Sequence, residues 1–171
     1  MASYPMHFAN ALGIPQMTMI SVDVGAAGIH EYASGITVGE VVMNVHGKKS
    51  GAVAALVDGS ERDFSHILDS NCNIEAITGD SEEGLYILRH SCAHLLAQAV
   101  TELFPDAKPT IGPPIDTGFY YDFHMDPIGD EELRAIEKKM IEHIRANHAI
   151  IREDHSNDVL REMFASNPFK L

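Results

Sequence analysis

The sequence is poor in basic residues. Its 171 residues include 12 lysines and arginines against 25 aspartates and glutamates, which gives a formal net charge of −13. Residues 1–83 carry a net charge of −8 and residues 84–171 a net charge of −5. Affinity for nucleic acid comes mainly from basic side chains that neutralise phosphates. This balance therefore excludes either half as a strong nucleic-acid binder by itself.

Cysteines and long apolar runs are also scarce. Cys72 and Cys92 are the only cysteines, so a disulfide framework is excluded and a reducing cytoplasm is the expected compartment. No apolar run approaches the roughly 20 residues of a membrane-spanning helix, so we expect no membrane contact. The first seven residues, MASYPMH, lack the basic and apolar regions of a secretory signal. The 45% of residues that are hydrophobic can still form the core of one domain or of two small ones.

Changes in pattern along the chain divide it into four parts. Residues 1–15 have no clear period and are expected to be an irregular extension. Residues 16–79 alternate like strands around one helix, whereas residues 85–171 are mainly helical. Between them, residues 80–84 are acidic and rich in turn formers, which predicts a linker.

The region 16–79 has the pattern of a small sheet with one covering helix. Ile20, Val22 and Val24 alternate with their neighbours and predict a half-buried strand. Thr37 and Glu40 match a Thr-x-x-Glu capping box at the start of a short helix. Further strands are expected at 30–33, 53–57 and 73–78. This order predicts an α+β domain, for which a ubiquitin-like β-grasp is the natural arrangement.

The region 85–171 is expected to contain three helices, at 85–104, 130–147 and 158–165, with extended chain at 108–123 and a strand at 149–152. Asp130 is the expected cap of the second helix. The main core face of the first helix is expected to consist of Leu88, Cys92, Leu95, Leu96, Ala99 and Leu103. The apolar stripe of the second helix is expected to consist of Leu133, Ile136, Met140 and Ile144.

His90 and His94 are the main candidates for chemistry. At 100° per residue they lie 40° apart around a helix, so both imidazoles point the same way. Two such imidazoles can bind one metal ion, but Ser91 stands where a metalloprotease helix has glutamate, which argues against that class. Cys92 projects to the other side of the helix and cannot complete the site. The alternative is that both histidines simply pack and bond to the backbone.

A second candidate is the aromatic segment GPPIDTGFYYDF at residues 112–123. Adjacent tyrosines on a strand point to opposite faces, so one of Tyr120 and Tyr121 can pack while the other lines a cleft. The alternative is a hairpin that is held together by aromatic cross-strand contacts. The pair Lys48 and Lys49 is the only basic pair in the first region, and such a pair is usually a solvated turn.

These motifs resemble a known family. RHSCAHLLAQAV at 89–100, FPDA at 104–107, and IGPP at 111–114 continuing to GFYYDF at 118–123 are similar to the start of the editing domain in threonyl-tRNA synthetases of the bacterial type. The stretches GITVGE at 35–40 and AALVDG at 54–59 resemble the preceding ubiquitin-like TGS domain. The resemblance covers about residues 17–171, with the two parts in the same order. Alanyl-tRNA synthetases share a His-x-x-x-His helix but not this preceding domain.

The resemblance implies a function in hydrolytic editing. The family attaches threonine to its tRNA with ATP, and its editing domain removes serine that was attached by mistake. A site that accepts threonine cannot strongly exclude serine, because a missing methyl group changes binding by only about 1–3 kcal/mol. His90 and His94 match the family's first pair of editing histidines, with water positioning, proton transfer or metal binding as open roles. Tyr121 matches a tyrosine of the same pocket, and Tyr120 is expected to pack.

The resemblance also implies that part of the site is missing. The family completes it with a later Asp-x-Cys-x-Gly-x-His segment, which does not occur in this sequence. We therefore expect a truncated chain that does not edit alone, binds tRNA weakly or not at all, and is monomeric, whereas the complete enzyme is expected to be a homodimer. Zinc at His90 and His94 is expected only if other ligands complete the site. The ATP, magnesium and zinc of the synthetic reaction belong to an absent catalytic domain.

Two other interpretations stay open. The chain could be a non-enzymatic module that binds RNA or a partner through its TGS-like domain, with Lys48 and Lys49 as the supporting feature. It could also be a freestanding hydrolase that edits in trans, if two copies complete each other's sites. In the first and leading interpretation, residues 85–171 are expected to expose apolar side chains that missing strands would cover.

Overall fold

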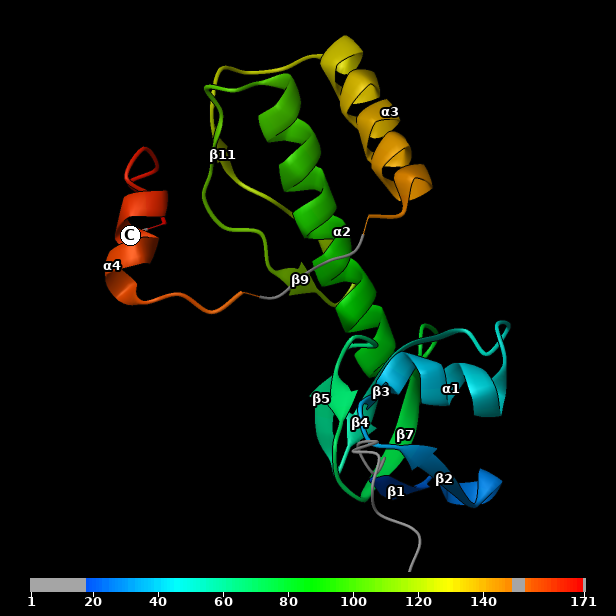
Figure 1. The fold of residues 1–171 in the computed structure, drawn as a ribbon. Helices are drawn as coiled ribbons and strands as arrows, with labels where there is room; N and C mark the ends of the chain where they lie inside the picture. The colour runs from blue at the N-terminus through cyan, green and yellow to red at the C-terminus, as the bar shows by residue number, and fades with distance from the viewer. Residues whose placement is uncertain (1–17, 149–152, 171) are drawn as a thin grey trace, which may run out of the picture. The chain divides into compact units, whose positions relative to one another are not determined.

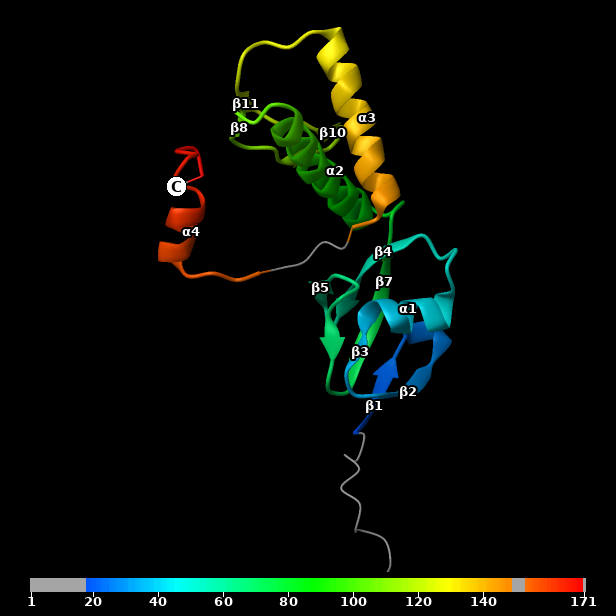
Figure 2. The ribbon, with the colours of Figure 1, turned by 45° about the horizontal axis from the view of Figure 1, so that its top comes forward.

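The computed structural model describes residues 18–148 and 153–170. The chain forms two compact units, Met1–Thr78 and Gly79–Leu171. Both mix helices with strands, as Figures 1 and 2 show, so the expected α+β class is confirmed. Two predictions, the irregular extension over residues 1–15 and the strand at 149–152, lie outside the described residues. No helix of the described residues is long and apolar enough to span a membrane.

The first unit is a five-stranded mixed sheet in the order β2-β1-β7-β4-β5. Its strands are β1 (Met19–Asp23), β2 (Ile29–Ala33), β4 (Ala52–Val57), β5 (Ser60–Arg62) and β7 (Cys72–Thr78). β1 pairs antiparallel with β2 and parallel with β7. A short helical turn η1 (Gly25–Ala27) connects β1 to β2. The additional pair β3 (Ile36–Thr37) and β6 (Ile67–Leu68) had no signal in the sequence, because each strand has only two residues.

Helix α1 (Val38–His46) packs its apolar face on this sheet. It begins with the predicted capping box. The Thr37 hydroxyl accepts from the Glu40 N–H at 3.3 Å, and the Glu40 carboxylate accepts from the Thr37 N–H at 2.8 Å. The core consists of buried residues from the helix and from alternate strand positions, namely Ile20, Val22, Val24, Val38, Val41, Val42, Ala55, Leu68 and Ile74. The period-two pattern at residues 20–24 therefore identified the buried face of β1 correctly.

The second unit is built on the long helix α2 (Glu82–Leu103). The predicted linker at 80–84 is wrong over its second half, because the helix already begins at Glu82. The Ser81 hydroxyl caps it by accepting from the Gly84 N–H at 3.0 Å. Glu82 and Glu83 lie in the first turn, where negative charge is favourable to the helix dipole. The acidic residues that suggested a linker are therefore part of a helix start.

Helix α3 (Asp130–Ala146) lies beside α2 in both ribbon views. Its cap is Gly129, whose N–H donates to the Glu132 carboxylate, and not Asp130 as predicted. The expected apolar stripe is only partly buried. Ile136 is 4% exposed, but Leu133 is 53% and Ile144 is 63% exposed. The helix thus contacts α2 with one flank of the stripe and leaves the other flank in solvent.

The core of the second unit is small. It consists of Ala99, Val100, Ala107 and Ile136, with six partly buried neighbours. The predicted core face of α2 is therefore wrong in its first half, where Leu88 and Cys92 are exposed. Ala99 is buried as expected because the second half of α2 is where α3 and the residues after α2 pack.

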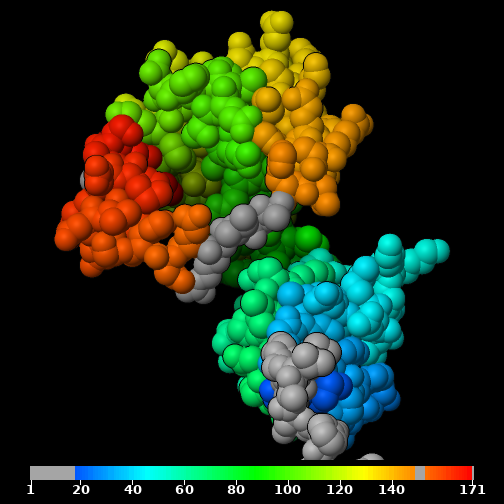
Figure 3. All heavy atoms as spheres, viewed as in Figure 1, coloured from blue at the N-terminus to red at the C-terminus, as the bar shows by residue number. Residues whose placement is uncertain are grey.

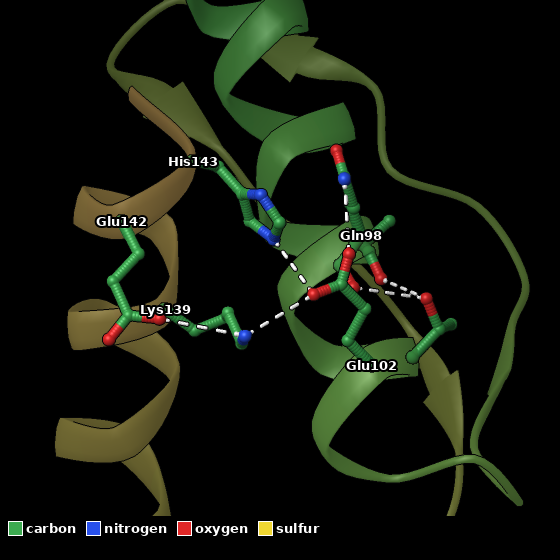
Figure 4. Close-up of polar contacts among 7 residues, drawn as sticks. Gln98, Glu102, Lys139, Glu142 and His143 are labelled. Carbon is green, nitrogen blue, oxygen red and sulfur yellow. Dashed lines mark hydrogen bonds and ion pairs between the residues drawn. The ribbon is translucent and has the colours of Figure 1, made fainter. Parts of the chain in front are cut away.

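A cluster of charged residues joins α2 to α3 (Figure 4). The Glu102 carboxylate accepts from His143 Nε2 at 3.0 Å and from Lys139 Nζ at 3.5 Å. Lys139 also pairs with Glu142 at 3.5 Å. Gln98 Nε2 donates to Glu102 at 3.1 Å, and this bond, followed by the nearby His143 and Lys139, holds the pKa of Glu102 below its usual value. These contacts fix the helix that carries the candidate histidines against its neighbour.

Short strands follow α2 and hold the aromatic segment. β8 (Lys108–Pro109) pairs with β11 (Phe123–His124), and β9 (Pro114–Ile115) pairs with β10 (Gly118–Phe119). The C-terminal helix α4 (Asn157–Met163) and the residues after it complete the unit. In Figure 3 the red atoms of this last segment lie against green atoms of the same unit.

Candidate functional site

The two histidines of α2 are in direct contact. His90 Nε2 and His94 Nε2 lie 3.1 Å apart, and the rings stack with centroids 4.7 Å apart and an angle of 28° between their planes. This contact requires one ring to donate N–H and the other to accept, so the pair shares one proton between the two Nε2 atoms. The ring of Tyr86 lies edge-on to His90 at 6.3 Å. The helical spacing therefore brings both imidazoles to one point, as predicted.

The environment of His94 favours its neutral imidazole. The pKa of His94 is lowered, first by partial burial, then by repulsion from His90, and then by the positive charge of Lys170. Neutral histidine can accept a proton from water near pH 7, which is the property that a general base needs. Helix α2 thus carries a candidate proton acceptor at His94.

Lys170 is a functional candidate that the sequence analysis missed. Its Nζ donates to the backbone carbonyl of Thr110 at 2.9 Å and lies 3.5 Å from the Tyr121 hydroxyl. The same ammonium is close enough to His94 to lower its pKa. The sequence feature that could have indicated Lys170 is the scarcity of basic residues, since Lys170 is the only lysine or arginine after Arg161. In an acidic chain, an ammonium whose charge acts on His94 is a specific feature.

The segment around Lys170 is bound to the β8 region at two further points. Asn167 Nδ2 donates to the carbonyl of Pro109 at 2.9 Å. The ring of Phe169 lies 5.6 Å from that of His124. These contacts link residues 58 and 45 positions apart in the sequence, and they hold the segment after α4, which carries Lys170, against the β8 region.

Tyr121 is packed, and Tyr120 is exposed. The Tyr121 ring stacks on Phe123 with centroids 4.8 Å apart, whereas Tyr120 is 47% exposed. The expectation that Tyr120 packs is therefore wrong. The connection between Tyr121 and His94 is indirect: the Lys170 ammonium contacts the Tyr121 hydroxyl, and its charge contributes to the lowered pKa of His94.

The pair does not form a complete metal site with the residues around it. Zinc is held by four protein ligands in structural sites and by three in catalytic sites. His90 and His94 provide two, and no group of three or more His, Cys, Asp or Glu within residues 18–148 and 153–170 could hold a metal ion. A metal at this position would need ligands in addition to the described ones.

A cavity of about 710 Å³ lies in the first unit and not at the histidines. It is bordered by η1, by His46 at the end of α1, by Ser50 after that helix, and by residues of β7 that include Glu75. His90, His94, Tyr121 and Lys170 are the candidate residues for chemistry in the second unit.

Comparison with known proteins gives the family. No family model matches the chain. The threonine–tRNA ligase of Thermobifida fusca (strain YX) is 46% identical over 140 residues, which are 81% of this chain. Those of Herminiimonas arsenicoxydans and Symbiobacterium thermophilum are 42% and 36% identical over 150 residues each, or 86% of the chain. The chain is related to the threonine–tRNA ligases.

The similarity to threonine–tRNA ligases covers most of the chain but a small part of each ligase. The aligned residues are 21% of the Thermobifida ligase, 23% of the Symbiobacterium ligase and 24% of the Herminiimonas ligase. The chain thus spans about a fifth to a quarter of the length of these relatives. The resemblance found in the sequence motifs is confirmed at the level of the family.

Proposed function

We propose that the second unit supplies part of a site that hydrolyses serine from threonine tRNA, and that the first unit is a TGS-type β-grasp domain. The observation that carries the proposal is the contact of His90 with His94 in a chain related to threonine–tRNA ligases. The strand order β2-β1-β7-β4-β5 with one covering helix supports the β-grasp. The attachment of threonine, with ATP, magnesium and zinc, would belong to residues outside this sequence.

The chemistry of the proposed site is the hydrolysis of an ester. Water attacks the carbonyl carbon of the seryl ester, and the neutral imidazole of His94 or His90 takes the proton from the water. The carbonyl oxygen becomes negatively charged in the tetrahedral intermediate, where the Lys170 ammonium and the Tyr121 hydroxyl can stabilise it. When the ester bond breaks, the ribose oxygen leaves and takes up the proton from the imidazole. Serine is released as the free acid.

The chain is proposed to contribute to editing in a longer protein and to be inactive alone. Its net charge of −13 supports this, because the contacts to tRNA phosphates need bases that the chain has in small number. We expect the chain itself to be monomeric and cytoplasmic, the longer protein to be a homodimer, and zinc at His90 and His94 only with ligands from elsewhere.

Two measurements test this proposal. Serine-charged threonine tRNA incubated with the chain is expected to lose serine no faster than without protein. Turnover that disappears in His90→Ala would instead support a freestanding hydrolase and contradict the partial site. An analogue of the seryl adenosine end of tRNA, with an amide in place of the ester, is expected to bind and shift the imidazole signals of His90 and His94. Absence of any shift would contradict the serine site.

A competing function is a TGS-type module that binds RNA or a partner without catalysis. It predicts that tRNA binding, if detected, depends on Lys48 and Lys49 and is unchanged in His90→Ala. The editing site proposed above predicts that binding of the seryl analogue is lost in His90→Ala and is unchanged when Lys48 and Lys49 are substituted. Substitutions at Lys48 and Lys49, compared with His90→Ala, therefore distinguish the two functions.

A further inference from the structure

Tyr121 occupies the space that a side chain at position 112 would need. A Cβ atom added to Gly112 would lie 2.5 Å from Cε2 and 2.6 Å from Cγ of the Tyr121 ring, and closer still to Cδ2. Real Cβ atoms essentially never come within 3.0 Å of such neighbours. Any residue other than glycine at this position therefore has to displace the ring.

The backbone does not explain why glycine stands at position 112. Gly112 is absent from the residues with positive φ, whereas Gly28, with φ of 86° and no neighbour within 4 Å of an added Cβ, needs glycine for its backbone conformation. Gly112 thus has a backbone conformation that alanine can adopt. The three atoms nearest to an added Cβ all belong to the Tyr121 ring, so the ring is the main obstacle to a side chain here.

The two backbone segments cannot separate easily to relieve a clash. The Asp122 N–H donates to the carbonyl of Ile111 at 2.9 Å, and the Thr110 N–H donates to the carbonyl of Asp122 at 2.9 Å. These bonds join the residues directly beside Gly112 and Tyr121. The Tyr121 ring is the movable part, and its movement takes the hydroxyl away from Lys170 and the ring face away from Phe123.

We propose that Gly112 is a positioning residue, which sets the place of the Tyr121 ring and with it the contact of the Tyr121 hydroxyl with the Lys170 ammonium. The stacking of Tyr121 on Phe123 at 4.8 Å and the contact of its hydroxyl with Lys170 Nζ at 3.5 Å both depend on the ring lying against Gly112. The effect of Gly112 on catalysis depends on the function proposed above. Its effect on the position of the Tyr121 ring does not depend on that function.

The test is the substitution Gly112→Ala in three backgrounds, measured as the shift in the midpoint of thermal unfolding of the 171-residue chain. In the native background the midpoint is expected to fall. In the Tyr121→Ala background the fall is expected to disappear, because the ring that causes the clash is gone. Tyr120→Ala is the matched control, since it removes a neighbouring exposed tyrosine, and there the full fall is expected to persist.

A spectroscopic measurement separates positioning from stability alone. In the native chain, nuclear Overhauser contacts are expected between the Gly112 α-protons and the Tyr121 ring, and between the Tyr121 and Phe123 rings. In Gly112→Ala the contacts between the two rings are expected to be lost. An equal fall of the midpoint in the native and Tyr121→Ala backgrounds, or unchanged ring contacts in Gly112→Ala, would overturn the proposal.

The seryl analogue then connects ring position to function. The native chain is expected to bind it, and Gly112→Ala is expected to bind it several-fold more weakly. If the native chain does not bind it, the proposed function fails while the ring measurements still decide the role of Gly112. If Gly112→Ala loses the ring contacts but binds the analogue as the native chain does, Gly112 has no role in the site, which would overturn the proposal.

Discussion

The pKa of His94 depends on its surroundings, which include His90 one turn earlier on the same helix and Lys170 from the end of the described chain. Burial lowers its pKa most, and the adjacent His90 and the positive charge of Lys170 lower it further. All three effects disfavour the imidazolium ion. His94 is thus kept neutral at the pH where a proton acceptor is useful.

The pKa of His94 can be measured by NMR titration of the chain. It is expected to lie below the ordinary value of 6.5. Both His90→Ala and Lys170→Ala are expected to raise it, with the larger rise in His90→Ala because His90 has the larger effect. Lys138→Ala removes a charge from another helix and is expected to leave it unchanged. A titration in which neither His90→Ala nor Lys170→Ala raises the pKa would contradict the proposed electrostatics of the pair.

The same shift makes a prediction for stability. Because the pKa of His94 is lower in the folded chain than in the unfolded chain, the unfolded chain binds a proton first as the pH falls. The second unit should therefore lose stability as the pH falls below 6.5. Urea denaturation at pH 7.5 and pH 5.5 is expected to show a smaller loss in His94→Gln than in the native chain. An equal loss in both chains would exclude this contribution of His94.

At the scale of elements, the start of helix α1 is determined by a local sequence motif. Thr37 and Glu40 satisfy each other's backbone N–H groups at the start of the helix. Thr37→Ala is expected to reduce the free energy of unfolding of the first unit by about 1 kcal/mol, which is typical of a lost cap. Glu40→Gln is the milder control, because glutamine can still accept from the Thr37 N–H. A cost of Thr37→Ala no larger than that of Glu40→Gln would contradict the cap.

The Glu40 carboxylate adds a dependence on pH. The backbone N–H and hydroxyl of Thr37 hold the pKa of Glu40 below its ordinary value of 4.5. A group with a lowered carboxyl pKa stabilises the fold above that value and loses its contribution as the pH falls below it. The difference in stability between native chain and Glu40→Gln should therefore shrink in acid. If the difference in unfolding free energy between the native chain and Glu40→Gln were the same at pH 7 and pH 3.5, this would contradict the interaction of Glu40 with Thr37.

Helix α3 provides a matched pair of substitutions. Ile136 is buried against α2, and Leu133 on the same predicted stripe is largely exposed. Ile136→Ala is expected to cost at least about 2 kcal/mol of unfolding free energy, whereas Leu133→Ala is expected to cost less than about 0.5 kcal/mol. Urea denaturation monitored on the second unit measures both. Similar costs would mean that α3 packs with the whole stripe, contrary to the structure.

At the scale of the whole molecule, the two units differ in how well they bury their apolar residues. Of the eighteen large hydrophobic residues that are exposed among the described ones, fourteen follow Thr78. The core of the first unit has nine buried residues and that of the second has four. Backbone amides of β1 are therefore expected to exchange with deuterium more slowly than those of α2. Equal protection of both elements would contradict this difference.

The sequence predicted what depends on neighbouring residues and missed what depends on distant ones. The strand at residues 20–24, the Thr37 cap and the meeting of His90 with His94 all follow from short-range spacing, and the structure contains them. Lys170 reaches Thr110 across 60 positions, and no pattern in the chain marks such a contact. The exposed flank of α3 was missed for a related reason, since periodicity shows that a face is apolar but not what covers it.

The binding of serine by the second unit tests the account most directly. The amide analogues of seryl and threonyl adenosine would be titrated into the chain, with the imidazole signals of His90 and His94 as the readout and His90→Ala as the control. The account predicts saturable shifts with the seryl analogue, weaker binding of the threonyl analogue, and loss of seryl binding in His90→Ala. Equal binding of both analogues, or seryl binding that is unchanged in His90→Ala, would contradict an editing site at this histidine pair.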